Sequence, residues 1–173
     1  KPMPGLIETT VRNLKDVSPT QYYNVPRGFD LLMPYLENDA ELRKNFFRNL
    51  DMVFYAGAAL PQATWARLEA VARRVRPDDP VWFTTSWGST ETSPAITSAH
   101  WKLERAGVIG LPLPGIEMKF IPNAEKLELR VRGVTIFPGY RNAPHLTAQA
   151  FDEEGYYRIG DAGVLADPQR PEQ

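Results

Sequence analysis

The sequence of 173 residues contains no cysteine. Disulfides, thiol nucleophiles and thiolate metal sites are therefore excluded, and the composition is compatible with a reducing cytosol. The 20 basic residues are balanced by 21 acidic residues, so a net charge of −1 offers no basic excess for nucleic acid or an anionic membrane. No apolar run approaches the roughly 20 residues that span a bilayer. We therefore expect a cytoplasmic protein with no membrane span and no nucleic-acid partner.

Several motifs of common enzyme classes are also missing. His100 and His145 are the only histidines, and neither has a partner at metal-ligand spacing, which favours two surface residues. Ser89 is not part of a Gly-x-Ser-x-Gly turn, so a hydrolase triad is disfavoured. No Gly-x-Gly-x-x-Gly follows a strand, which disfavours a Rossmann dehydrogenase. Hydrophobic residues make up 43% and charged residues 24%, as in a folded globular protein.

The first part of the chain predicts alternating helices and strands. Residues 51–55 and 81–83 form two apolar runs, and residues 65–75 between them carry apolar side chains at helical spacing. Strand, helix and strand in this order predict a βαβ unit with a parallel pair of strands. Upstream we expect a weak helix over residues 6–14, a short strand over 20–25 ended by Pro26, a helix over 29–36 with a kink at Pro34, and a helix opened by a capping box from Asn38 to Glu41.

The second part predicts antiparallel strands. Residues 107–115 are rich in glycine and proline and indicate a boundary. Residues 116–120 and 127–131 then alternate apolar and charged side chains, which predicts a hairpin with a turn at 122–125. A last strand is expected over 156–163. The fold class is therefore α/β, with a parallel βαβ portion at residues 1–106 and a smaller, antiparallel, barrel-like β portion at 107–173.

Two unusual stretches follow the strands of the βαβ unit. After the second strand, residues 86–91 supply a ring to cover a base, hydroxyls for phosphate oxygens and a carboxylate for magnesium. After the first strand come the small residues Gly57, Ala58 and Ala59, which let a flat ligand approach the backbone. Ligands of open α/β sheets bind at the carboxyl ends of the strands, where both stretches lie. The alternatives are an ordinary polar loop for the first stretch and tight helix–strand packing for the second.

Three motifs together resemble those of the adenylate-forming (AMP-binding) family, which includes acyl-CoA synthetases, luciferases and adenylation domains of peptide synthetases. Residues 86–91 (SWGSTE) resemble its aromatic-Gly-x-Thr-Glu motif, residues 128–140 its Gly-Glu-Leu…Gly-Tyr motif, and residues 157–161 (YRIGD) its aromatic-x-x-Gly-Asp motif. Within the family, residues 23–29 and 54–58 most resemble feruloyl-CoA synthases. Trp87 stands where tyrosine is usual, and the Gly-Glu-Leu motif lacks its leading glycine.

The resemblance implies an ATP-dependent ligase that activates a carboxylic acid as acyl-AMP and transfers it to coenzyme A. An aromatic acid such as a hydroxycinnamate is expected, with ATP, Mg²⁺ and coenzyme A as cofactors and substrates. The implied catalytic residues are Thr90 on the phosphate and Glu91 on magnesium, and Asp161 is implied to accept the ribose hydroxyls. The other implied nucleotide-binding residues are Gly57, Ala58, Ala59, Ser86, Trp87, Gly88 and Ser89, with Trp87 covering the adenine.

Each implied role has a structural alternative. Glu91 fits a carboxylate at a helix N-terminus, Asp161 fits an Asx-turn, and Trp87 fits a core residue. At the level of function, the alternatives are a non-catalytic AMP-binding module and a relative that performs adenylation only.

The resemblance also implies a middle fragment of the family's large N-terminal domain that ends before the hinge. The family's phosphate loop and the C-terminal domain with its catalytic lysine have no counterpart in the 173 residues. The ends, residues 1–5 and 167–173, have the composition of loops. We therefore expect the isolated chain to be inactive, and we expect exposed strand edges to favour contacts with the missing parts of the protein or self-association into a homo-oligomer.

Overall fold

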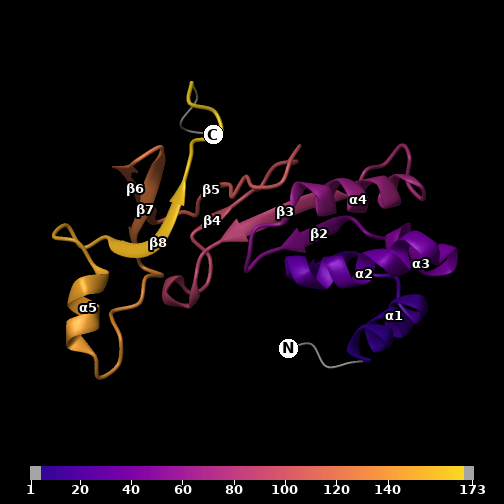
Figure 1. Ribbon diagram of the computed structural model, residues 1–173, viewed down its shortest axis with the longest axis horizontal. Coiled ribbons are helices and arrows are strands. Elements are labelled where there is room, and N and C mark those ends of the chain that lie inside the picture. Colours follow the sequence, from indigo (N-terminus) through magenta and orange to yellow (C-terminus); the bar gives the residue numbers. More distant parts are fainter. Residues whose placement is uncertain (1–4, 170–173) are drawn as a thin grey trace. The chain divides into compact units, whose positions relative to one another are not determined.

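The computed structural model describes residues 5–169, which form two compact units (Figure 1). The first unit comprises the described residues up to Thr85 together with Ala99–Val108, and the second comprises Ser86–Ser98 together with the residues from Ile109 onward. The change of unit after Val108 lies near the boundary expected after residue 106. Ser86–Ser98, expected in the first portion, is grouped with the second unit. The loop-like ends at residues 1–4 and 170–173 lie outside the described residues.

The first unit has the predicted α/β order. Its strands β1 (Gln21–Asn24), β2 (Met52–Tyr55) and the first part of β3 (Trp82–Trp87) pair in parallel, which confirms the βαβ prediction. The helix between β2 and β3 is α4 (Gln62–Arg73), and the other helices are α1 (Leu6–Asp16), α2 (Pro26–Asn38) and α3 (Ala40–Arg48). No helix within residues 5–169 has both the length and the apolar character that a membrane crossing requires.

The core of the first unit lies between one face of these strands and the helices. Tyr22, Val53 and Phe83 are opposite one another in register and therefore share a face. The ring of Tyr22 packs edge-on against Phe46 of α3, with centroids 4.9 Å apart, and Phe83 packs against Trp65 of α4 at 4.8 Å. The fully buried aromatic residues are Phe29, Phe46 and Phe47.

The predicted start of α3 was wrong by one residue. Asn38 is still the last residue of α2, where its side-chain amide donates to the carbonyl of Pro34 at 2.7 Å. The N-cap of α3 is Asp39, whose carboxylate accepts the backbone N–H of Leu42 at 3.0 Å. A single residue separates the two helices, so only Asp39 has the extended backbone that a cap requires.

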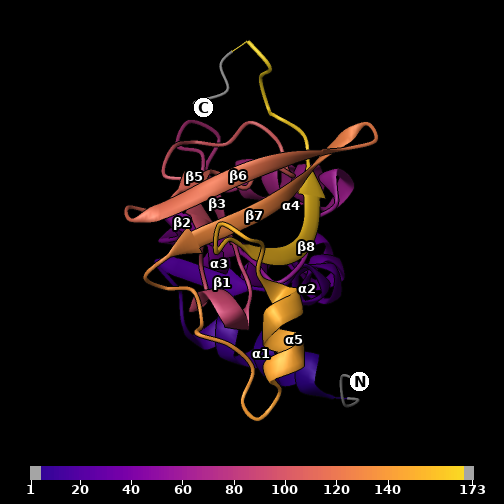
Figure 2. The same ribbon diagram turned by 90° about the vertical axis from the view of Figure 1, so that its left-hand side faces the viewer.

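The second unit contains the predicted antiparallel strands. The hairpin of β6 (Ile116–Asn123) and β7 (Lys126–Gly133) pairs with β8 (Tyr157–Gly163) in a three-stranded sheet of order β6-β7-β8 (Figure 2). Helix α5 (Pro144–Ala150) lies between β7 and β8 in sequence. Two short strands were not predicted, because β4 (Thr97–Ser98) and β5 (Leu111–Pro112) are too short to show a periodicity.

The motif at residues 86–91 is not the ordinary polar loop that the sequence offered as the alternative. Ser86 and Trp87 still belong to β3 and pair antiparallel with Ser98 and Thr97 of β4. The residues that follow turn once as the 3₁₀ helix η1 (Thr90–Thr92). Strand β3 therefore changes from parallel to antiparallel partners as it enters the second unit.

A buried aspartate in the turn before β8 binds basic side chains of both β6 and β7. The carboxylate of Asp152 accepts hydrogen bonds from Lys119 at 2.7 Å, from Arg130 at 3.1 Å and from the backbone N–H of Tyr156 at 2.9 Å. Its side chain is 1% exposed. Burial disfavours the charged form, but these hydrogen bonds outweigh it and hold the pKa of Asp152 well below its usual range.

We predict that Asp152→Asn lowers the unfolding midpoint of the protein by several degrees at pH 7, because Lys119 and Arg130 lose their shared charge partner. The pKa of Asp152 is lower in the folded protein than in the unfolded chain. The contribution of the ionised group is therefore complete above about pH 4 and declines as the pH falls further. Thermal unfolding at pH 7 measures the change in midpoint. Urea unfolding of wild type and variant between pH 7 and pH 3 measures how the stability difference depends on pH. Glu153→Gln, at an exposed neighbour, is the control. A stability difference that does not shrink below pH 4 would contradict the assignment.

Candidate functional site

The second unit brings all three sequence motifs together. The indole Nε1–H of Trp87 donates to Oδ2 of Asp161 at 2.9 Å. The hydroxyl of Tyr140 donates to Oε1 of Glu91 at 3.3 Å, and the backbone N–H of Phe137 donates to the carbonyl of Glu91 at 2.8 Å. Segments up to 74 residues apart in sequence therefore meet through side chains of the motifs themselves.

A bulge in β8 positions Asp161. Glu128 pairs with Ala162 and Arg130 with Arg158, so that residues 159–161 of β8 face Leu129 alone. Gly160, at the centre of this bulge, has a φ of 88°, which favours glycine. A bulge bends its strand and redirects a side chain. Asp161 is therefore an exposed strand residue, and the Asx-turn alternative was wrong.

Trp87 combines two roles. Its ring is half-buried and packs against the second hydrophobic cluster, which is centred on Ile96, Val131 and Tyr157. Its N–H edge reaches Asp161. The core alternative is thus correct for part of the ring, and the polar edge remains available to organise the carboxylate.

Gly88 is required by the fold of the motif. A Cβ at this position would lie 2.1 Å from the carbonyl oxygen of Pro94 and 2.9 Å from Oγ1 of Thr92. The fully buried Thr92 closes the turn, because its hydroxyl accepts the N–H of Ser89 at 2.8 Å and donates to the carbonyl of Ser89 at 3.0 Å. The glycine and the second threonine therefore fix the backbone between Trp87 and Glu91 before any ligand binds.

The surroundings of Glu91 favour its ionised form. Its own backbone N–H, the side chain of Ser89 and the hydroxyl of Tyr140 favour the ionised carboxylate and lower its pKa, although burial acts in the opposite direction. Glu91 lies in the first turn of η1, so the helix-terminus alternative describes its position correctly. Within residues 5–169 there is no cluster of three or more His, Asp or Glu residues suited to a metal. One ionised carboxylate nevertheless fits Mg²⁺, which is commonly held by one or two carboxylates and substrate phosphates.

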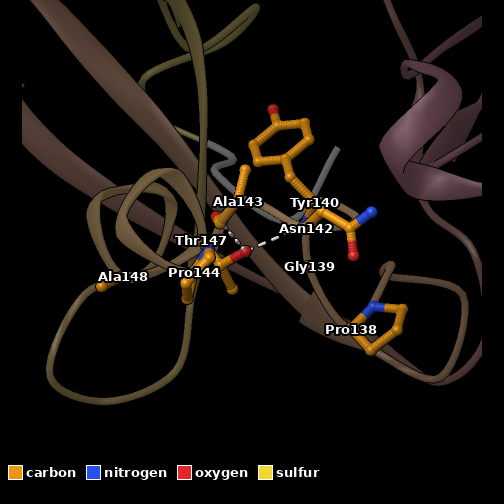
Figure 3. Close-up of a pocket in the computed structure, with 8 residues that line it drawn as sticks. All are labelled: Pro138, Gly139, Tyr140, Asn142, Ala143, Pro144, Thr147 and Ala148. Atoms are coloured by element: carbon orange, nitrogen blue, oxygen red, sulfur yellow. Dashed lines mark hydrogen bonds between the residues drawn. The ribbon is translucent and has the colours of Figure 1, made fainter.

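Tyr140 is held by the segment that follows it. The backbone N–H of Tyr140 donates to Oγ1 of Thr147 at 2.9 Å, and the Thr147 hydroxyl in turn donates to the carbonyl of Ala143 at 3.2 Å (Figure 3). Gly139, with φ of 143°, permits this approach, because a Cβ there would lie 2.5 Å from Cγ2 of Thr147. An open pocket of about 510 Å³ is lined by Pro138, Gly139, Tyr140, Asn142, Ala143, Pro144, Thr147 and Ala148.

The remaining predicted residues occupy different positions. Ser86 donates its hydroxyl to the carbonyl of Thr97 at 2.6 Å and so belongs to the strand pairing. Thr90 is exposed at the start of η1. Gly57, Ala58 and Ala59 are exposed in the loop after β2, in the first unit. Their convergence with Trp87 and Asp161 on one nucleotide stays a prediction.

Sequence reasoning missed two residues of the site. Tyr140 was recognised as part of a motif, but its bond to Glu91 was not foreseen. Thr147, in α5, was not assigned to the site from the sequence. The spacing of Gly139, Tyr140 and Thr147 was the available signal, since a hydroxyl one helical turn inside α5 can bond back to the preceding loop.

We predict that Gly88→Ala destabilises the protein by about 1–3 kcal/mol, because the new methyl group collides with a backbone carbonyl that cannot move aside cheaply. Denaturant unfolding measures the loss. Gly163→Ala in β8 is the matched control, since its Cβ would meet only Leu129 at 3.8 Å, and we expect a change within about 0.5 kcal/mol. Equal stability of the two variants would show that the turn at Gly88 is looser than described.

Comparisons with known proteins agree with the motifs. A family model described as "AMP-binding enzyme" matches residues 2–141. The chain is 34% identical over 129 residues to phenylacetyl-CoA ligase epaB of Aspergillus niger, which covers 69% of this chain and 23% of that protein. It is 30% identical over 165 residues to inactive atromentin synthetase invA4 of Paxillus involutus, which covers 79% of this chain and 17% of that protein.

Solved structures show the same fold. A malonyl-CoA ligase in a ternary product complex, with methylmalonyl-CoA and AMP bound, matches with a TM-score of 0.75 and 34% identity. The match covers 94% of this chain and 34% of that one. The chain thus spans about a quarter or less of the curated relatives described above, with 23% of the first and 17% of the second.

Proposed function

Because the chain belongs to the AMP-binding enzyme family, we propose that it is the nucleotide-binding part of an ATP-dependent acid–thiol ligase. The observation that carries the proposal is the meeting of Trp87 with Asp161, and of Glu91 with Tyr140, inside one unit. A ring beside a carboxylate suits an adenosine, and an ionised carboxylate nearby suits the magnesium that accompanies a triphosphate. The small share of the relatives that the chain covers supports a longer enzyme.

The proposed reaction has two steps. In the first, the carboxylate of the acid attacks the α-phosphorus of ATP, an acyl–phosphate bond forms, and the bond to the β-phosphate breaks to release pyrophosphate. In the second, the thiolate of coenzyme A attacks the acyl carbon, the thioester forms, and AMP leaves with the bonding electrons. The first step brings an anion to a polyanion, so orientation and charge compensation dominate the barrier.

Each candidate site residue has a distinct part in this proposed reaction. Asp161 accepts the ribose hydroxyls and Trp87 covers the adenine. Thr90, exposed beside Glu91, donates its hydroxyl to phosphate. Glu91 would hold magnesium, which supplies electrostatic compensation for the phosphate charge when bound. The resemblance to the family also implies Gly57, Ala58 and Ala59 as nucleotide-binding residues.

An aromatic acid is the proposed substrate class. The stretches at residues 23–29 and 54–58 resemble feruloyl-CoA synthases, and one relative is named as a phenylacetyl-CoA ligase. Tyr55, at the end of β2, is 3% exposed and packs against Trp65 in the core of the first unit, so it is not part of the proposed acid site.

A non-catalytic nucleotide-binding protein is the second candidate, and an adenylation-only relative is a variant of the first. The relative named as inactive atromentin synthetase invA4 favours the second candidate, because a family member without activity also resembles this chain. A phosphate loop and a lysine-bearing domain in the complete gene, together with ATP–pyrophosphate exchange, distinguish the ligase. Exchange without thioester formation indicates the adenylation-only relative.

We predict that the 173-residue chain binds AMP and that Asp161→Ala weakens binding about tenfold or more, since hydrogen bonds to a charged acceptor are lost. Isothermal titration calorimetry measures both affinities. Asp78→Ala, at an exposed carboxylate of the first unit, should leave the affinity unchanged. Equal weakening by both variants, or none by either, would remove Asp161 from the proposed site.

For the protein encoded by the complete gene, we predict a higher kcat/KM with hydroxycinnamates than with malonate, measured as AMP release in the presence of coenzyme A. A preference for phenylacetate over ferulate would keep the aromatic class and reject the hydroxycinnamate. A preference for malonate would reject the aromatic class altogether.

A further inference from the structure

The hydrogen bond between Trp87 and Asp161 shows how the two side chains are oriented, which the motifs alone do not. The indole N–H lies in the plane of its ring, so the hydrogen bond of 2.9 Å turns a ring edge, and not a ring face, toward the carboxylate. The ring faces are therefore directed away from Asp161. A base stacked on one face would have its sugar near the edge, where the carboxylate lies.

The indole also restrains a side chain that has little other support. Asp161 is exposed on the bulge of β8. Within residues 5–169, the indole of Trp87 is its one side-chain hydrogen-bond donor. An exposed carboxylate without such a donor samples several rotamers, and each rotamer that does not face the ligand reduces affinity.

The bond leaves enough capacity for a ligand. A carboxylate has two oxygens with about four acceptor directions, and Trp87 uses one direction on Oδ2. Oδ1 and the remaining direction on Oδ2 are available for two hydroxyl donors. Tyrosine, usual at this position in the family that the motif resembles, offers no in-plane N–H at the side of its ring.

We propose that Trp87 is a positioning residue, whose indole N–H fixes the carboxylate of Asp161 in the orientation that receives the ribose hydroxyls. This inference rests on the proposed function for the identity of the ligand. The hydrogen bond and its effect on Asp161 belong to the chain itself. Trp87 therefore contributes through Asp161 in addition to any stacking on the base.

A double-mutant cycle separates these two contributions. Trp87→Phe keeps a ring and removes the N–H, and Asp161→Ala removes the acceptor. We expect Trp87→Phe to weaken AMP binding about tenfold when Asp161 is present and less than about twofold in the Asp161→Ala background, since coupled residues are not additive. Equal weakening in both backgrounds would reduce Trp87 to a stacking residue and overturn the proposal. Trp82→Phe is the control for the loss of an indole donor as such. Trp82 also donates its indole N–H, in its case to the carbonyl of Trp101 at 3.1 Å.

A spectroscopic arm tests the hydrogen bond without any nucleotide. The indole proton of Trp87, assigned by its absence in Trp87→Phe, should shift upfield in Asp161→Ala. It should stay near its wild-type position in Asp161→Asn, whose amide oxygen still accepts. The indole protons of the other tryptophans show whether each variant remains folded. An unshifted Trp87 proton in a folded Asp161→Ala variant would overturn the proposal.

The two arms also separate the proposal from the proposed function. If wild type fails to bind AMP while the Trp87 proton responds to Asp161, the nucleotide assignment fails and the positioning of Asp161 stands. If wild type binds AMP and neither the cycle nor the indole proton shows coupling, the positioning role fails and the nucleotide site stands.

Discussion

The position of the Asp161 carboxylate depends on Trp87, whose ring is half-buried. Trp87 is anchored by packing against the cluster around Ile96 and Val131, and its free edge fixes Asp161. The same turn of chain then presents Glu91, which is held by Tyr140. Rigid packing on one side of the motif thus creates order on its exposed side, as a preorganised ligand site requires.

Glycines and threonines provide the backbone geometry that this order needs. Gly88 lets the chain pass the carbonyl of Pro94, Gly139 lets the Tyr140 loop approach Thr147, and Gly160 allows the bulge that redirects Asp161. Thr92 and Thr147 satisfy backbone groups in the turns beside them. These positions explain why the motifs contain small and hydroxyl residues even apart from a nucleotide.

Much of the fold could be predicted from the sequence. Apolar periodicity gave the helices of the first unit, and alternation gave the hairpin of β6 and β7, because both patterns extend over several residues. The cap at Asp39 and the short strands β4 and β5 were missed, because they depend on one residue or on partners distant in sequence. The motifs identified the site segments, but the pairs Trp87–Asp161 and Tyr140–Glu91 required coordinates, since no spacing rule connects residues 74 or 49 positions apart.

The second unit therefore brings the separate motifs into contact through their side chains, while the small residues 57–59 belong to the first unit. The most direct test of the account is a crystal structure of the chain with an acyl-AMP analogue. The account predicts ribose hydroxyls on the carboxylate of Asp161, adenine on the face of Trp87 and the phosphate beside Thr90. A nucleotide bound away from Asp161 and Trp87 would contradict it.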